Sequence, residues 1–264
     1  MIKISIIIAT FNAAKTLSKC LDSIVDQLTD ETELILVDGG STDSTNEIIK
    51  SYGNKVAIHI SEKDNGIYDA WNKGIKLSHA PWVSFIGADD VLLPMTLSHY
   101  LDVIHNTPNI ESYDYICAFN KYVDENENEV APIGGSPHWP IFRKRMNAAH
   151  VASLHNKKKL FETIGYYNTS FKICADYELL LRKKDKLKFI FIPKYIAGMQ
   201  IGGMSFSTRA ILETFHIRQK HSGLGNLENM LLFIRDWCSF KVYCIILFFR
   251  GKISLTKLFN FLKR

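Results

Sequence analysis

Short apolar runs alternate with segments of helical period through the first 110 residues of the chain. The apolar runs are rich in isoleucine, valine and leucine, are short enough to be strands, and cover residues 3–10, 33–38, 56–60 and 82–86. Apolar side chains recur at helical spacing over residues 17–28 and 67–77. This alternation is typical of βαβ units and predicts an α/β fold with a mostly parallel central sheet flanked by helices.

The pattern changes beyond about residue 113. The sequence DENENE at residues 124–129 indicates an exposed turn between two strands, and glycines and prolines predict a loop over residues 132–140. The later pattern predicts a helix at 176–187, a strand at 189–201 and helices from residue 205 onward. We therefore expect one domain over residues 1–222, followed by a helical tail over residues 223–264.

The composition is that of a globular protein. With 264 residues, 47% of them hydrophobic, the chain can bury a full core, which excludes a disordered protein. The five cysteines are dispersed and lack metal-ligand spacing, so we expect free thiols and a cytoplasmic location. The longest apolar run, residues 242–249, is much shorter than the roughly 20 residues that cross a membrane. We therefore expect no spanning segment.

The basic charge is confined to the end of the chain. The formal net charge is +5, but the residues after Met230 carry +6 and the first 230 residues carry −1. A nearly neutral main domain argues against nucleic acid as a partner. The apolar and basic tail instead predicts an amphipathic helix at an anionic membrane surface. The alternative is a C-terminal helix that packs on the domain.

Polar side chains follow three of the predicted strands. They are Thr10 and Asn12, then Asp38 and Ser41, then Asp89 and Asp90. Because ligands bind outside the carboxyl ends of parallel strands, we expect these groups to share one edge of the sheet. Carboxylates suit Mg²⁺ or Mn²⁺, and magnesium usually takes one or two of them together with substrate phosphates. The alternative for the last pair is a turn residue followed by a helix N-cap.

Two common phosphate-binding loops are absent. A dinucleotide-binding turn needs G-x-G-x-x-G, and residues 9–14, ATFNAA, contain no glycine. The motif G-x-x-x-x-G-K-[ST] is also missing. A divalent metal is therefore the natural partner for a bound diphosphate.

Five blocks of sequence resemble, in order, the motifs of family 2 glycosyltransferases. The blocks are residues 6–12 (IIIATFN), 37–45 (VDGGSTDST), 65–74 (NGIYDAWNKG), 85–90 (FIGADD) and 166–182, which contains ADYELLLR. The resemblance implies a GT-A fold that binds a nucleotide diphosphate sugar, usually a UDP-sugar, together with Mn²⁺ or Mg²⁺. It implies inverting transfer of a hexose or N-acetylhexosamine. Residues 1–110 would be the nucleotide-binding half of the domain, and residues 111–222 the half that holds the acceptor and the base.

The resemblance also implies site residues. Thr10 and Asp38 would contact the base and ribose, Asp64 would lie close to the base, and Asp89 would touch the ribose or diphosphate. Asp89 or Asp90 would hold the metal, a choice that spacing leaves open. The expected nucleotide-binding set is completed by Asn12, Ser41 and Asn72. Gly87 stands where the family usually has the first acid of D-x-D, which predicts fewer carboxylates at the metal.

Asp176 matches the position of the family's general base. Inverting transfer requires a group that takes the proton of the acceptor hydroxyl as it attacks, and a carboxylate can do so. The alternative is a first-turn aspartate that interacts with the helix dipole. Glu178 is expected to be a solvated helix residue. His150 faces the sugar site or is a buried structural histidine.

The resemblance and the tail together predict a polyprenyl-diphosphate-linked glycan as the acceptor, in the assembly of a surface polysaccharide such as O-antigen. The protein would then be peripheral on the inner face of the cell membrane. One alternative is a nucleotide-sugar-binding subunit without catalysis. Another is a phosphatase with a D-x-D-x-T motif starting at Asp38, but Gly40 stands where that motif needs its second aspartate.

Overall fold

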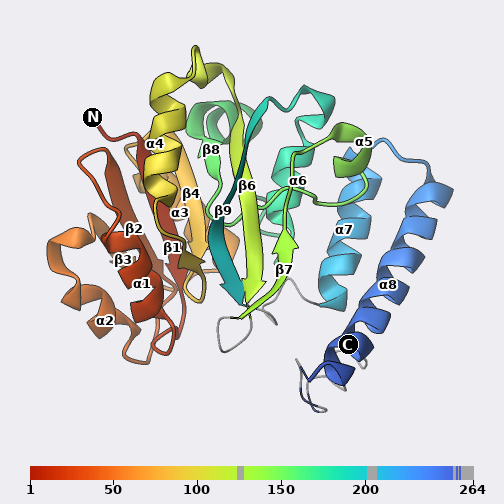
Figure 1. Ribbon diagram of the computed structural model, residues 1–264, viewed down its shortest axis with the longest axis horizontal. Coiled ribbons are helices and arrows are strands. Elements are labelled where there is room, and N and C mark those ends of the chain that lie inside the picture. The colour runs from red at the N-terminus through yellow and green to blue at the C-terminus, as the bar shows by residue number, and fades with distance from the viewer. Residues whose placement is uncertain (124–127, 201–206, 252–253, 255, 257–264) are drawn as a thin grey trace.

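The computed structural model describes residues 1–123, 128–200, 207–251, 254 and 256. These residues form one nine-stranded sheet. Figure 1 shows helices on both of its faces. The strand order is β3-β2-β1-β4-β8-β6-β9-β5, with β7 paired to β6. The predicted central sheet and its flanking helices are thus present, and the chain continues into two further helices on the side of β6 and β7.

The first half of the chain forms the parallel part of the sheet. Its strands are β1 (Ile4–Thr10), β2 (Thr32–Asp38), β3 (Ile58–Ser61) and β4 (Trp82–Gly87), and its helices are α1 (Leu17–Val25), α2 (Thr45–Ser51) and α3 (Ile67–Leu77). The register places Thr10 beside Asp38, Asp38 beside Ser61, and Ala9 beside Gly87. The strands therefore end together, and the loops that follow them meet at one edge.

The second half adds antiparallel pairs. Its strands are β5 (Val91–Leu92), β6 (Tyr115–Val123), β7 (Glu129–Ile133), β8 (Leu154–Asn156) and β9 (Phe189–Gln200), and its helices are α4 (Thr96–Asn106), α5 (Trp139–Phe142) and α6 (Ala175–Leu181). Strand β8 runs antiparallel to β4 and β6, whereas β9 runs parallel to β6. Single helical turns lie at Gly53–Lys55, Ile110–Ser112 and Lys184–Lys186, and a π-helical turn at Lys157–Glu162.

Two predicted boundaries are wrong. The loop expected at 132–140 is shorter, because β7 continues to Ile133 and α5 begins at Trp139. The helix expected at 176–187 ends at Leu181, and a separate turn follows it. The predicted turn at 124–129 falls mainly on residues outside the described part of the chain, but the strands on either side of it pair antiparallel.

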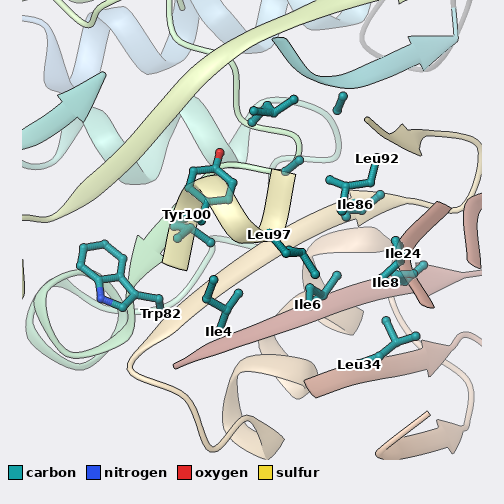
Figure 2. Close-up of a cluster of buried hydrophobic side chains, with 14 of the residues drawn as sticks. Ile4, Ile6, Ile8, Ile24, Leu34, Trp82, Ile86, Leu92, Leu97 and Tyr100 are labelled. Atoms are coloured by element: carbon teal, nitrogen blue, oxygen red, sulfur yellow. The ribbon is translucent and has the colours of Figure 1, made fainter. Parts of the chain in front are cut away.

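Alternate residues of the parallel strands fill the two faces of the sheet. Ile4, Ile6 and Ile8 point into the cluster shown in Figure 2, together with Trp82 and Tyr100. The intervening positions fill a second cluster on the opposite face, where α3 and α6 pack. Parallel strands that are buried on both faces read as continuous apolar runs, which explains why their positions were predictable.

Gly74 lets α3 approach β1 closely. A Cβ atom added at this position would lie 2.4 Å from Ile7 Cγ2. We expect Gly74→Ala to lower the free energy of unfolding by about 1–3 kcal/mol, although helix propensity alone predicts a gain of about 1 kcal/mol. Urea denaturation measures the change. Gly225→Ala is the control, because nothing lies within 4 Å of its added Cβ, and equal stabilities of Gly74→Ala and wild type would contradict the prediction.

The described part of the tail is mainly helical and packs on α7. Helix α7 (Thr208–His221) is followed by α8 (Asn226–Phe249), which lies beside it at the outer edge in Figure 1. The buried Arg218 of α7 donates to Asn229 Oδ1 (2.9 Å) and to Asp236 Oδ2 (2.7 Å) on α8. Among the described residues, no helix combines the length and the apolar character that crossing a membrane requires.

Candidate active site

The ends of β1, β2 and β3 converge on the carboxylate of Asp38. Its Oδ1 accepts hydrogen bonds from the hydroxyls of Thr10 (2.9 Å) and Ser41. Its Oδ2 accepts from the Ser61 hydroxyl (2.6 Å), the Asn46 side-chain amide (3.1 Å) and the backbone N–H groups of Gly40 and Ser41. Thr10, Asp38 and Ser41 are therefore brought together as the sequence predicted.

Asp38 has no exposed surface, although the sequence predicted that it contacts the base and ribose. Burial acts to raise its pKa, but the hydrogen bonds from Ser41, Ser61 and Thr10 outweigh burial and hold the pKa at about 2. Both oxygens face donors inside the protein. In this structure Asp38 is a buried anion that shapes the loop after β2, and it offers no oxygen to a ribose or base.

Asn12 joins the loops after β1 and β2. Its side-chain Oδ1 accepts from the Thr42 N–H (2.9 Å), and its own N–H donates to Ser41 Oγ (2.8 Å). It has φ = 49°, a left-handed conformation that asparagine tolerates better than most residues. Phe11 beside it is 65% exposed, a feature that the sequence reasoning missed. The exposed ring and the exposed Asn12 form the open side of this edge.

Asp64 lies over the loop that Asp38 shapes. A Cβ atom added to Gly39 would lie 2.6 Å from Asp64 Oδ2, so the glycine lets this carboxylate approach the end of β2. Asp64 Oδ1 accepts from the Gly66 N–H (2.8 Å) at the start of α3. Unlike Asp38, Asp64 is partly exposed.

The two aspartates after β4 differ in exposure. Asp90 is buried and its Oδ2 accepts from the Gly87 N–H (3.1 Å), which closes the turn. Burial, and secondly the charge of Asp89, raise the pKa of Asp90 to about 8. Asp89 is exposed. The structure thus separates a carboxylate that is folded into the turn from one that faces outward.

The side-chain amide of Asn72 is hydrogen-bonded to the backbone of Tyr167. Its Nδ2 donates to Tyr167 O (2.9 Å), and its Oδ1 accepts from the Tyr167 N–H (3.0 Å). Both polar atoms of the side chain are therefore used to hold the segment before α6 against α3. In this geometry Asn72 holds the Tyr167 backbone, a task that the sequence did not indicate.

Asp176 lies in the first turn of α6 and is partly buried. The Tyr68 hydroxyl is 3.1 Å from its Oδ1 and also donates to Ile173 O (2.5 Å). Burial raises the pKa of Asp176 to about 6, although hydrogen bonds from the Tyr177 backbone and Tyr68 act to lower it. Lys172 Nζ donates to Asn65 O (2.9 Å), so the segment before α6 reaches the residue that follows Asp64.

His150 is a buried structural histidine. It stacks against Trp71 and Phe85, with ring centroids 5.3 and 5.6 Å apart, and its Nε2 is 3.0 Å from the Tyr167 hydroxyl. Burial lowers its pKa to about 3, so the ring is neutral. Of the two interpretations for His150, the structure supports the structural one.

Glu178 was expected in solvent and is instead buried. Arg182 donates to it from Nε (3.0 Å to Oε2) and from Nη2 (2.5 Å to Oε2), and His221 Nε2 lies 2.8 Å from Oε1. The same guanidinium donates to the carbonyls of Ile164, Gly165 and Tyr166. Glu178 therefore anchors α6 and the segment before it, a role that depends on partners that local sequence does not reveal.

The arrangement offers three chemical functions at one edge of the sheet. Exposed Asn12 and Phe11, with Asp64, surround the ends of β1 and β2. Asp89 presents an outward carboxylate after β4. Asp176 is a partly buried carboxylate with a pKa raised into the range of a general base. In the described residues, no three histidine, cysteine or acidic side chains gather closely enough to hold a metal unaided.

Comparisons with known proteins identify the family of the chain. The profile of Glycosyl transferase family 2 matches residues 5–163. The PGL/p-HBAD biosynthesis glycosyltransferase of Mycobacterium bovis (strain BCG / Pasteur 1173P2) is 35% identical over 185 residues, which are 67% of this chain and 68% of that protein.

Solved structures share the fold at low sequence identity. S. aureus TarS 1–349 in complex with UDP has a TM-score of 0.61 and 18% identity, with 88% of this chain and 70% of that chain covered. The mannosyltransferase PcManGT from Pyrobaculum calidifontis, in complex with GDP-Man and Mn²⁺, has a TM-score of 0.60 and 14% identity, with 97% and 77% covered. The predicted GT-A fold is confirmed. The chain belongs to glycosyltransferase family 2, as its five sequence blocks indicated, and is a glycosyltransferase.

Proposed function

We propose that this glycosyltransferase transfers a hexose or N-acetylhexosamine, with inversion, from a UDP-sugar to a lipid-linked glycan. The observation that carries the proposal is the carboxylate of Asp176. It is partly buried, has a pKa raised to about 6 by burial, and belongs to a segment that contacts the start of α3 near Asp64. A base with this pKa is ionised at neutral pH and still has appreciable affinity for a proton.

The reaction that follows from this site is a single in-line displacement. Asp176 takes the proton of the acceptor hydroxyl while the oxygen attacks the anomeric carbon on the face opposite the diphosphate. Tyr68 holds the carboxylate by its 3.1 Å contact with Oδ1. No nucleophilic serine or cysteine is required, because no covalent sugar intermediate forms.

The donor would bind over the ends of β1 and β2. The exposed ring of Phe11 can stack on a base, and Asp64 can accept a hydrogen bond from it, while Asp38 holds the loop beneath them. Structural neighbours were solved with UDP, UDP-GlcNAc or GDP-Man, which supports a nucleotide sugar and leaves the choice of sugar to experiment.

The donor set after β4 fits one Mn²⁺ or Mg²⁺ ion bound jointly by protein and substrate. Asp89 supplies an exposed carboxylate, and magnesium commonly takes one or two carboxylates and completes its shell with phosphates and water. When bound, the ion would neutralise charge on the departing diphosphate. Of the two ligands that the sequence left open, exposure favours Asp89, because Asp90 Oδ2 already accepts from Gly87.

The acceptor would occupy an open pocket of about 390 Å³ between residues 145–146 and helices α7 and α8. Its lining combines the aromatic rings of Phe240 and Tyr243 with the guanidinium of Arg145, a combination that suits a sugar ring and a phosphate. The side of this pocket formed by α7 lies close to the segment that carries Asp176. Cys174 Sγ of that segment is 3.5 Å from Ala210 O of α7.

We expect the outer side of α8 to bind the inner face of the cell membrane, which would make the protein peripheral and cytoplasmic. Six of its exposed apolar residues share one side of the helix, namely Leu227, Leu231, Ile234, Val242, Ile245 and Phe249. They lie on the side of α8 opposite the buried residues Asn229 and Leu232. One side of α8 therefore packs on the protein, and the other side is available to a membrane surface.

Replacing Leu231 and Ile245 together by glutamate should weaken binding to anionic phospholipid vesicles about 100-fold, since each apolar side chain contributes roughly 1.5 kcal/mol or more. Vesicle co-sedimentation measures the change. Leu212→Glu is the control, because Leu212 is 43% exposed but lies on α7. Vesicle binding that survives the double replacement would contradict the proposed membrane face. Loss of a dimer in the same variant would point to a second copy instead.

The proposed function is tested by incubating the protein with a panel of UDP- and GDP-sugars and a polyprenyl-diphosphate-linked acceptor, with Mn²⁺ or with EDTA. We expect transfer from one UDP-sugar, and the anomeric configuration of the product, determined by NMR, should be inverted. Binding of UDP without transfer to any acceptor would instead support a non-catalytic subunit.

A further inference from the structure

We infer that Glu213 of α7 is a positioning residue for the base, because it holds the backbone of the three residues that lead into α6. This inference rests on the proposed role of Asp176. Glu213 lies outside the five sequence blocks along the chain and was not among the candidate residues that the sequence suggested. Figure 1 shows α7 running alongside α6.

The Glu213 carboxylate accepts three backbone hydrogen bonds. Oε1 accepts from the Lys172 N–H (3.0 Å), and Oε2 accepts from the N–H groups of Ile173 (2.9 Å) and Cys174 (3.0 Å). These residues directly precede α6, where N–H groups have no carbonyl partner within the helix. The cap residue Cys174 makes no capping bond with its own side chain. Glu213 therefore supplies from another helix the acceptor that local sequence does not provide.

The same segment is held from its other side by the residue that contacts the base. Tyr68 donates to Ile173 O (2.5 Å) and lies 3.1 Å from Asp176 Oδ1. The peptide units around Ile173 are thus fixed at their N–H groups by Glu213 and at a carbonyl by Tyr68. A shift of this segment would move Asp176 and Tyr68 relative to each other, and so would change the direction of the carboxylate.

Charge supplies a second link between Glu213 and the base. The titratable groups that face Asp176 are Tyr68 from α3, Tyr167 and Cys174 from the preceding segment, Tyr115 from β6, and Glu213 from α7. Burial raises the pKa of each tyrosine and of the cysteine, so these groups stay neutral. The Glu213 carboxylate adds a negative charge that raises the pKa of Asp176 beyond the effect of burial.

The alternative interpretation is that Glu213 only stabilises the fold. Two replacements separate the alternatives. Glu213→Gln keeps the size of the side chain, but it removes the charge and places an NH₂ group where an acceptor is needed. Glu213→Asp keeps the charge but is one methylene shorter and cannot reach all three N–H groups. Glu228→Gln is the control, because Glu228 is a partly exposed carboxylate on α8 that pairs with Lys144 and not with the segment before α6.

The experiment combines kinetics at 25 °C with a ¹³C NMR titration of the Asp176 carboxyl, assigned by its loss in Asp176→Asn. For Glu213→Gln we expect kcat to fall about 10- to 100-fold with KM for the UDP-sugar unchanged, and the Asp176 titration to move to lower pH. For Glu213→Asp we expect a similar fall in kcat with the titration unmoved. Glu228→Gln should change neither quantity.

An unmoved Asp176 titration in Glu213→Gln, or an unchanged kcat in both variants, would overturn the inference. If Glu213→Gln does not fold, Glu213→Asp decides by its kcat alone, since an unchanged value shows that the three bonds do not position the base. Absence of transfer by the wild type refutes the proposed function instead. The NMR titration still tests the link between Glu213 and Asp176 in that case, because it needs no activity.

Discussion

Replacing Asp176 by asparagine is expected to lower kcat about 10²–10⁴-fold while leaving the affinity for UDP unchanged. Asparagine is close in size and can still contact the Tyr68 hydroxyl, so the fold of the α6 segment should survive. What it cannot do is take a proton from the acceptor. Initial rates at saturating acceptor and calorimetric titration with UDP measure the two quantities. Asp185→Asn, an exposed acid in the turn after α6, is the control.

The pH dependence gives an independent check of the same residue. Burial raises the pKa of Asp176 to about 6, and the base acts in its ionised form. Activity should therefore be present above pH 6 and fall as the pH drops through 6, by about tenfold for each further pH unit. The residual activity of Asp176→Asn should lack this acid limb. A limb that persists in the variant, or one centred near pH 4, would show that another group controls the rate.

The parts of the site that the sequence predicted are those fixed by strand ends. Thr10, Asp38 and Ser41 came together because parallel strands with apolar runs of similar length end at one edge, and this register follows from the βαβ pattern. Asp176 was placed by its motif and its position in a first turn. The first prediction needed only chain order and local period, whereas the second came from the resemblance to the family.

The partners of other polar side chains could not be predicted. Asn72 and Glu178 are polar residues on helices, and their partners, Tyr167 and His221, are remote in the sequence or lie on another helix. Whether such a side chain is solvated depends on tertiary packing, which no local pattern reports. Glu213 was missed for the same reason, because its three partners are backbone groups of a segment some 40 residues earlier.

The spacing of residues could not predict which of Asp89 and Asp90 is buried. Two adjacent aspartates after a strand leave open which one turns inward. In the structure Asp90 turns inward, because its Oδ2 accepts a hydrogen bond from the Gly87 N–H, and Asp89 is exposed. The difference leads to a prediction about metal dependence, since only an exposed carboxylate can share an ion with a bound diphosphate.

Asp89→Asn is accordingly expected to reduce Mn²⁺-dependent transfer at least about 100-fold, since a metal that stabilises a leaving diphosphate contributes several kcal/mol. Transfer by EDTA-treated wild type should be lost and should return on titration with Mn²⁺, whereas Asp89→Asn should need far more Mn²⁺ or fail to respond. Asp90→Asn is the matched control. It keeps a group of the same shape at the buried turn position, so it should retain the wild-type half-saturation for Mn²⁺, and its main effect should be on stability.

Two results would contradict this assignment. Transfer by wild type at an undiminished rate in EDTA would remove the metal from the mechanism altogether. A raised Mn²⁺ requirement in Asp90→Asn, with a normal response in Asp89→Asn, would mean that the turn reverses when the donor binds and that Asp90 is the ligand. The pair of variants therefore distinguishes the two carboxylates, because their exposures differ while their chemistry and position in the chain are nearly the same.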